Sequence, residues 1–116
     1  MSSILLVEDD RDSREALAFV LEDAGHTVTS TGNGREALEL LDEGEQPDLI
    51  LLDLMMPVMN GWEFLGERKR RPRLASIPVM VLTAAALDDK LRDFDVTYVR
   101  KPVDGEQLVQ RIGKFR

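Results

Sequence analysis

Short apolar runs recur along the chain, and polar or turn-forming residues bound each of them. Residues 4–7 (ILLV) and 49–52 (LILL) are apolar without interruption, which is typical of strands buried on both faces of a sheet. Residues 79–83 (VMVLT) form another run of this kind. β-Branched residues favour two further strands, at 27–31 and 97–100, and the lower apolar content of 27–31 places it near an edge.

The stretches between these strands show apolar residues at helical spacing. The first predicted helix is capped by Asp12 or Ser13 and ended by Gly25. Further helices are predicted at residues 35–41, after Asn60–Gly61, at 87–94 as a short helix, and after Asp104.

Strands and helices therefore alternate along the whole chain. Strands that are linked by helices form a parallel sheet in right-handed crossovers, with helices on both faces. The length of 116 residues suits one domain with one core, and no repeat, linker or low-complexity segment interrupts it. The sequence thus predicts an α/β fold in a single domain, residues 1–116.

Polar residues directly follow the predicted strands, and in a parallel sheet these strand ends lie along one edge. The residues are Glu8, Asp9 and Asp10 after the first strand, Asp53 after the third, Thr83 after the fourth and Lys101 after the fifth. An Asp at a strand end also fits a simple turn or helix cap. The convergence of so many charges favours a functional site instead.

Clustered carboxylates repel one another unless a cation lies among them. Carboxylate oxygens suit Mg²⁺, and because no His or Cys lies nearby, zinc is not expected. A carboxylate nucleophile, a divalent cation, a lysine and a hydroxyl together form a site for phosphoryl transfer. In this interpretation Asp53 attacks, while Lys101 and Thr83 bind the phosphoryl oxygens.

Composition and charge narrow the class of protein further. A net charge of −7 opposes direct nucleic-acid binding, and no apolar run is long enough for membrane insertion. The basic run 68–71 is interpreted as a solvated helix end, and His26 as a surface residue. Trp62 is expected to pack at the core or its rim. The N-terminus lacks the basic and apolar regions of a signal peptide, so a cytoplasmic location is expected.

Four segments together resemble the receiver domains of two-component response regulators, the family of the bacterial chemotaxis regulator. They are residues 4–10 (ILLVEDD), 53–61 (DLMMPVMNG), 82–84 (LTA) and 98–102 (YVRKP). The resemblance covers essentially the whole chain, with the segments in the family's order. It implies a flavodoxin-like, doubly wound five-stranded sheet in the order 2-1-3-4-5.

The resemblance also implies a role for individual residues and partners. Asp53 would accept a phosphoryl group. Mg²⁺ would be held by Glu8, Asp9, Asp53 and the Met55 carbonyl. The phosphoryl group would contact Thr83 and Lys101, and the conformational switch would consist of Thr83 and Tyr98. Asp10 would be a neighbour of the metal ligands. The phosphoryl donor would be a sensor histidine kinase or a phosphotransfer protein. The signal would pass to a downstream protein target or an output domain, and no effector segment follows in this sequence. The chain is thus expected to be a signalling domain, not an enzyme, either stand-alone or part of a longer protein.

The chain departs from the family pattern between Thr83 and Lys101, where it is shorter by about one helical turn. Residues 93–96 (DFDV) replace the usual small residues and glycine. The fourth helix is therefore expected to be shortened or irregular. In the family this helix belongs to the surface that dimerises and contacts output partners.

Three other functions are compatible with parts of the pattern. A flavin-binding module shares the fold, but three carboxylates stand where its phosphate loop would be. A phosphatase with an Asp nucleophile would need a second Asp two residues after the first, where this chain has Met55. A degenerate receiver, which binds proteins without being phosphorylated, remains the main alternative.

Overall fold

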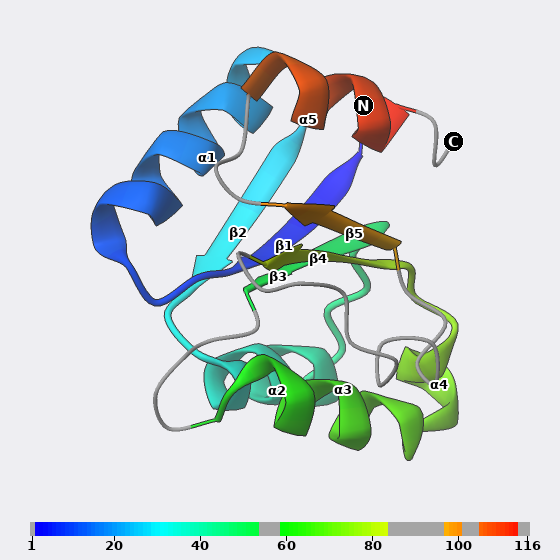
Figure 1. The fold of residues 1–116 in the computed structure, drawn as a ribbon. Coiled ribbons are helices and arrows are strands. Elements are labelled where there is room, and N and C mark those ends of the chain that lie inside the picture. The colour runs from blue at the N-terminus through cyan, green and yellow to red at the C-terminus, as the bar shows by residue number, and fades with distance from the viewer. Residues whose placement is uncertain (1, 54–58, 84–96, 101–104, 114–116) are drawn as a thin grey trace.

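The sheet has five parallel strands, and the computed structural model describes them within residues 2–53, 59–83, 97–100 and 105–113. The strands are β1 (Ser3–Val7), β2 (Thr27–Thr31), β3 (Leu49–Asp53), β4 (Val79–Thr83) and β5 (Thr97–Arg100). Their order is β2-β1-β3-β4-β5, and every neighbouring pair is parallel (Figure 1). This order confirms the predicted doubly wound fold and the edge position of β2.

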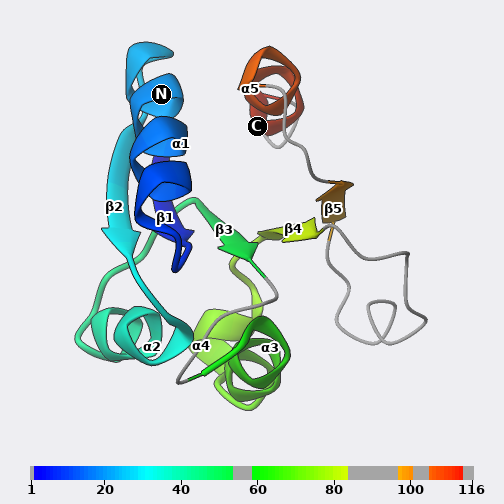
Figure 2. The same ribbon diagram turned by 60° about the vertical axis from the view of Figure 1, so that its left-hand side comes forward.

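The helices cover the sheet on two faces, as Figure 2 shows. On one face lie α1 (Arg11–Asp23) and α5 (Gly105–Gly113). On the other lie α2 (Gly34–Asp42), α3 (Gly61–Lys69) and the four-residue α4 (Pro72–Ala75). The sequence interpretation did not include α4, which begins at a proline and buries Leu74. The predicted helix at 87–94, with its expected shortening, lies outside the described residues.

Alternate residues of β1, β3 and β4 pack into two separate cores. One core, between the sheet and the α2–α3 layer, contains Leu5, Val7, Ile50, Leu52, Val79 and Val81. The other, under α1 and α5, contains Ile4, Leu6, Leu49, Leu51, Met80 and Leu82. All five residues of β3 are buried, so the uninterrupted apolar run of this central strand is explained by burial on both faces.

The start of α1 differs from the prediction, because Asp10 is its N-cap instead of Asp12 or Ser13. The Asp10 carboxylate accepts a hydrogen bond from the Ser13 backbone N–H at 3.0 Å, and the helix begins at Arg11. The cap needs an extended backbone, which Asp10 adopts where the chain leaves β1. Gly25 ends the helix as predicted, with a φ of 97° that favours glycine.

The basic run at the end of α3 is not simply a solvated helix end, so this interpretation was wrong for part of it. Arg68 is buried, and its guanidinium donates to the backbone carbonyls of Ile77, at 2.7 and 3.2 Å, and of Ala75, at 2.9 Å. Ala75 is the last residue of α4 and Ile77 lies between α4 and β4, so both carbonyls belong to the connection between two elements. The planar, multidentate guanidinium satisfies them together.

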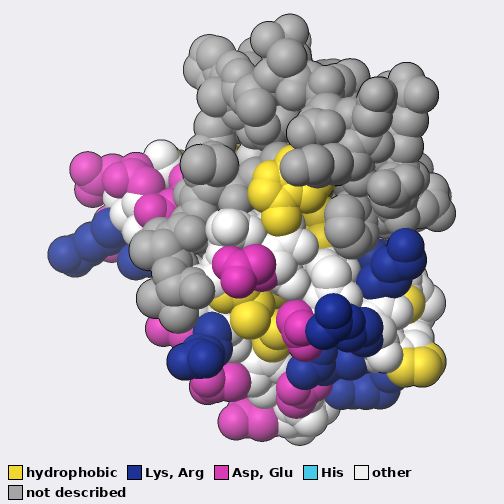
Figure 3. Space-filling view, turned by 60° about the horizontal axis from the view of Figure 1, so that its bottom comes forward, with side chains coloured by type: hydrophobic (Ala, Val, Ile, Leu, Met, Phe, Trp, Pro, Cys, Tyr) yellow, Lys and Arg dark blue, Asp and Glu magenta, His cyan; other side chains and the backbone are white. Residues whose placement is uncertain are grey.

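Arg71 in the same run forms ion pairs with Glu67, at 2.9 Å, and with Asp42 of α2, at 3.0 Å. These hydrogen bonds raise the pKa of the Arg71 guanidinium above its usual value, and the bond with Glu67 contributes most. Figure 3 shows Lys and Arg side chains lying among Asp and Glu on the side formed by α2, α3 and α4. The positive charge of the run is thus balanced locally and offers little attraction to nucleic acid.

Two single residues complete the comparison with the sequence predictions. Trp62 is partly buried and packs against the core under α2 and α3, as expected. His26 is also partly buried, and its Nδ1 accepts a hydrogen bond from the Ser2 backbone N–H at 3.0 Å. The description of His26 as a surface residue was therefore incomplete. Within the described ranges, none of the helices has the length and apolar character needed to cross a membrane.

Candidate functional site

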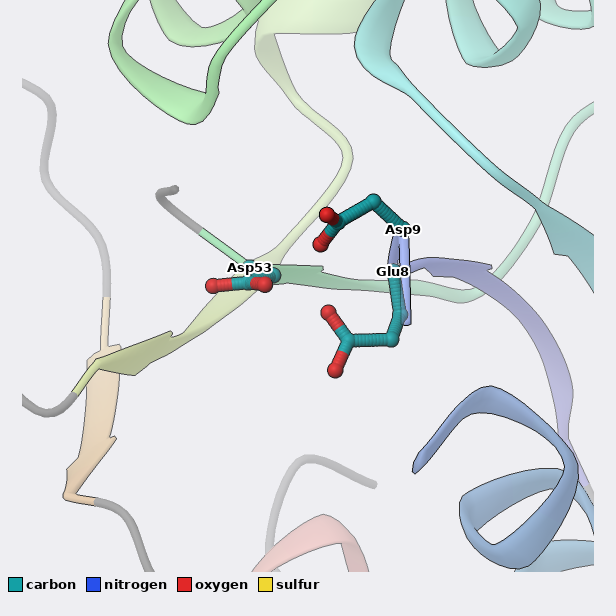
Figure 4. Close-up of side chains that lie close together, drawn as sticks. All are labelled: Glu8, Asp9 and Asp53. Atoms are coloured by element: carbon teal, nitrogen blue, oxygen red, sulfur yellow. The ribbon is translucent and has the colours of Figure 1, made fainter. Parts of the chain in front are cut away.

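Three carboxylates from two neighbouring strands meet at the carboxyl edge of the sheet. Val7 pairs with Leu52 in the register of β1 and β3, so the next residues, Glu8 and Asp53, come level with each other. Glu8, Asp9 and Asp53 each place a carboxylate oxygen within 4.8 Å of those of the other two. Figure 4 shows Glu8 and Asp9 projecting from the end of β1 toward the side of Asp53.

Two of the three carboxylates are withdrawn from solvent. Glu8 has a relative exposure of 1% and Asp53 of 4%, whereas Asp9 is exposed. Burial strengthens the repulsion between like charges, and the exposed Asp9 leaves one side open to an ion or a reactant. The donor set consists of oxygen atoms, which fits a hard divalent cation such as Mg²⁺ and does not fit zinc.

The backbone around Glu8 and Asp9 is held in place by neighbouring elements. The Glu8 N–H donates to the Thr31 carbonyl at 3.1 Å, which ties the end of β1 to the end of β2. The Arg14 guanidinium donates to the carbonyls of Glu8, at 2.9 Å, and Asp9, at 3.4 Å. Sequence reasoning missed Arg14, because a surface arginine one helical turn into α1 gives no signal of a bond to loop carbonyls.

The chain that follows Asp53 re-enters the described structure at Met59 and starts α3. Asn60 caps this helix in a reciprocal arrangement, since its side chain accepts from the Glu63 N–H at 2.9 Å and the Glu63 side chain accepts from the Asn60 N–H at 3.1 Å. The Met59 carbonyl accepts a hydrogen bond from the Gly34 N–H of α2 at 3.2 Å. Met59 is therefore tied to α2, and Asn60 fixes the start of α3.

The other predicted site residues are described only in part. Thr83 is the last residue of β4 and pairs in register with Arg100 of β5. Leu82, the residue before Thr83, pairs with Asp53 of β3. The predicted ligand Met55 and the predicted Lys101 lie outside the described residues. The structure thus brings Glu8, Asp9 and Asp53 together and places the end of β4 beside them.

Tyr98, the predicted switch residue, lies in β5 next to Val81 of β4. It is partly buried and packs against the core under α2 and α3. Its backbone carbonyl accepts a hydrogen bond from the Arg111 guanidinium of α5 at 3.2 Å. The residue therefore sits at the border between core and surface, where a change of side-chain rotamer costs less than in a fully buried position.

Comparison with known proteins identifies relatives along almost the whole chain. The response regulator receiver domain family matches residues 4–113. An uncharacterised 14.6 kDa protein of Leptolyngbya boryana is 40% identical, and the match covers 97% of this chain and 88% of that protein. The DNA-binding dual master transcriptional regulator RpaA of Synechocystis is 36% identical over 97% of this chain. The match covers only 48% of RpaA, so this chain spans about half the length of such regulators.

Among solved structures, the chemotaxis protein CheY4 of Vibrio cholerae superposes with a TM-score of 0.90. The two chains are 28% identical, and the superposition covers 100% of this chain and 99% of CheY4. The architecture and the sequence matches thus point to the same family.

Proposed function

Because this chain belongs to the family of response regulator receiver domains, we propose that it is a phospho-acceptor in two-component signalling, with Asp53 as the residue that is phosphorylated. One observation carries the proposal. Asp53 ends the central buried strand, and its carboxylate lies within 4.8 Å of those of Glu8 and Asp9. This is the arrangement that a carboxylate nucleophile with a divalent cation requires.

The reaction transfers a phosphoryl group from a phospho-histidine to Asp53. A carboxylate oxygen of Asp53 forms a bond to phosphorus as the bond between phosphorus and the histidine nitrogen breaks. The histidine nitrogen keeps the electron pair of the broken bond, and Asp53 becomes a mixed carboxylic–phosphoric anhydride. The rigid end of β3 holds the nucleophile in one position, which lowers the entropic cost of an in-line approach.

Glu8, Asp9 and Asp53 would hold a Mg²⁺ ion, together with the proposed carbonyl ligand of Met55. The bound ion supplies positive charge that offsets the charge of the phosphoryl oxygens. Around it, the chain's own residues complete the site. Lys101 would pair with the phosphoryl oxygens, and the Thr83 hydroxyl would donate to one of them. These last two roles rest on Thr83 as the last residue of β4 and on Lys101 as the residue that follows β5 in the sequence.

The acyl phosphate would then shift an equilibrium between two conformations. Movement of Thr83 toward the phosphoryl group would open space for Tyr98 to turn inward. The position of Tyr98 supports this role. The residue is partly buried beside Val81, and it lies two residues before Arg100, which pairs with Thr83. Such a change alters the surface of the last strand, where a partner would detect it.

The partners follow from the same reaction. The donor would be a sensor histidine kinase or a phosphotransfer protein, acting in the cytoplasm. The output would be a downstream protein or an output domain, because the net charge of −7 disfavours direct contact with nucleic acid. RpaA is a DNA-binding regulator about twice as long as this chain, which supports an output made outside the receiver domain.

The proposal is tested by intact-mass measurement after incubation with acetyl phosphate, with and without Mg²⁺. Gain of a single phosphoryl group that depends on Mg²⁺ is expected. No gain, under conditions that label another receiver domain, would favour the degenerate receiver that binds partners without phosphorylation.

Added Mg²⁺ is also expected to raise the melting temperature of the unphosphorylated chain. An ion that binds only the folded state at ten times its dissociation constant adds about 1.4 kcal/mol, or about 5 °C for a chain of this size. Calorimetry at constant ionic strength measures the shift. The shift should vanish in Glu8→Gln and persist in Asp10→Asn, whose side chain caps α1 and is not part of the carboxylate cluster. An equal shift in both variants would show that the ion binds elsewhere.

A further inference from the structure

Arg14, near the start of α1, forms hydrogen bonds with three consecutive backbone carbonyls of the acidic run after β1. Its guanidinium donates to the carbonyl of Glu8 at 2.9 Å and to that of Asp9 at 3.4 Å. Its backbone N–H donates to the carbonyl of Asp10 at 2.8 Å, which is the first hydrogen bond of the helix. A single residue therefore anchors the segment that carries two of the three carboxylates of the cluster.

The bonds from Arg14 hold a part of the chain that no strand or helix orders. Glu8 and Asp9 follow β1 and precede α1. The Glu8 N–H is bound to the Thr31 carbonyl at 3.1 Å, and the bond from Arg14 fixes the carbonyl of the same residue. Because the backbone is held at both groups, the Glu8 side chain leaves it in a fixed direction, toward the side of Asp53 (Figure 4).

The guanidinium is itself confined. Arg14 is partly buried, and a Cβ atom built on Gly32, in the turn after β2, would lie 3.5 Å from the Arg14 Nη1. The guanidinium thus lies between the end of β1 and this turn. The conformational entropy of the long side chain is therefore lost when the chain folds, and not when an ion binds.

Repulsion within the carboxylate cluster acts on the same segment before any cation is bound. The carboxylate oxygens of Glu8, Asp9 and Asp53 lie within 4.8 Å of one another. Asp53 belongs to β3, which is paired on both sides, so repulsion would displace mainly the connection between β1 and α1. The planar guanidinium opposes this displacement, because one rigid group is bonded to two successive carbonyls.

We propose that Arg14 is a positioning residue for the metal ligands: its guanidinium holds the backbone of Glu8 and Asp9 so that their carboxylates are in place before a divalent cation binds. The inference rests on the proposed function, since Mg²⁺ binding is its main readout. It assigns a role at the site to a side chain of α1 that contacts neither the ion nor the phosphoryl group in the proposed reaction.

Loss of position and loss of charge at residue 14 act on Mg²⁺ binding in opposite directions. A positive charge near a cation site repels the cation, so removal of the charge alone would strengthen Mg²⁺ binding. Removal of the hydrogen bonds to the Glu8 and Asp9 carbonyls would weaken it, because the ligands would then have to be ordered when the ion binds. The direction of the change therefore distinguishes the two effects.

The test compares Arg14→Met with Arg11→Met, three residues earlier in α1. Both substitutions remove one positive charge from the same end of the helix, but Arg11 is exposed and pairs on the surface with Glu15 at 3.1 Å. Titration calorimetry with MgCl₂ measures the affinity of each folded chain. Arg14→Met is expected to bind about tenfold more weakly, and Arg11→Met within about twofold of the native chain. Native or tighter binding by Arg14→Met overturns the inference.

Amide hydrogen exchange without metal shows where the chain is loosened. The Glu8 amide should exchange about fivefold faster in Arg14→Met. The Ile50 amide, which donates to the Pro78 carbonyl at 2.9 Å, should exchange at the native rate. Equal acceleration at both amides would mean that Arg14 serves only the stability of the whole fold, which overturns the inference.

Arg14→Lys keeps the charge and one donor but lacks the planar fork, so its affinity for Mg²⁺ should be about threefold weaker than native. If Arg14→Met does not fold, Arg14→Lys carries the test, and native affinity in this variant overturns the inference. A native chain that neither binds Mg²⁺ nor gains a phosphoryl group from acetyl phosphate overturns the proposed function, and this inference with it. A phosphorylated native chain with unaltered Mg²⁺ affinity in the Arg14 variants overturns the inference alone.

Discussion

Asp53→Asn is expected to lose phosphorylation by acetyl phosphate in Mg²⁺, with a rate lower than that of the native chain by more than about a thousandfold. The amide oxygen of Asn carries no negative charge and is a poor nucleophile toward phosphorus. Asn has nearly the same shape as Asp, so the buried end of β3 should keep its packing. Intact mass and circular dichroism, measured on the same samples, separate loss of the acceptor from loss of the fold.

Asp10→Asn is the matched control for this experiment. Asp10 stands in the same run of acidic residues, yet its carboxylate caps α1 at 3.0 Å from the Ser13 nitrogen. Since Asn caps helices as well as Asp does, this variant should fold and be phosphorylated at the native rate. If Asp53→Asn still gained a phosphoryl group, another carboxylate of the cluster would be the acceptor, and the assignment of Asp53 would be wrong.

Arg68→Met is expected to lower the free energy of unfolding by about 3 kcal/mol, the largest stability effect that we predict. The substitution removes charge-assisted hydrogen bonds to the carbonyls of Ile77 and Ala75, and it leaves the Ile77 carbonyl buried without this donor. A buried polar group that loses its partner costs about 1–3 kcal/mol, and bonds to a charged donor lie at the upper end. Urea denaturation measures the loss.

Arg70→Met serves as the control, because Arg70 lies in the same basic run but is largely exposed. Its ion pair with Glu67 at 2.9 Å is on the surface, and its removal should change stability by less than about 0.5 kcal/mol. The folded fraction of Arg68→Met should still be phosphorylated, since Ile77 precedes β4 at the opposite end of the sheet from Asp53. Equal destabilisation by the two variants would contradict the buried role of Arg68.

The elements of the fold were predictable because the signals for them are local. The unbroken apolar run of β3 reflects burial on both faces, and every residue of the strand is buried. Gly25 and Asn60 mark helix ends by backbone preference and by capping, which depend on only a few neighbouring residues. The start of α1 could not be fixed in this way, because Asp10, Asp12 and Ser13 are all competent caps. The path of the chain after β1 selects Asp10 among them.

By itself the sequence determined the parallel α/β architecture and the meeting of Glu8, Asp9 and Asp53 at one edge, since parallel strands joined by helices must all end on the same side. Only the tertiary structure decided which side chains hold the elements together, both at that edge and at the opposite end of the sheet. The bonds from Arg14 to the loop carbonyls, the burial of Arg68 and the contact of Gly34 with Met59 link segments that are not neighbours along a single strand or helix. An arginine or a glycine is compatible with many local environments, and the packing of elements against one another selects one of them.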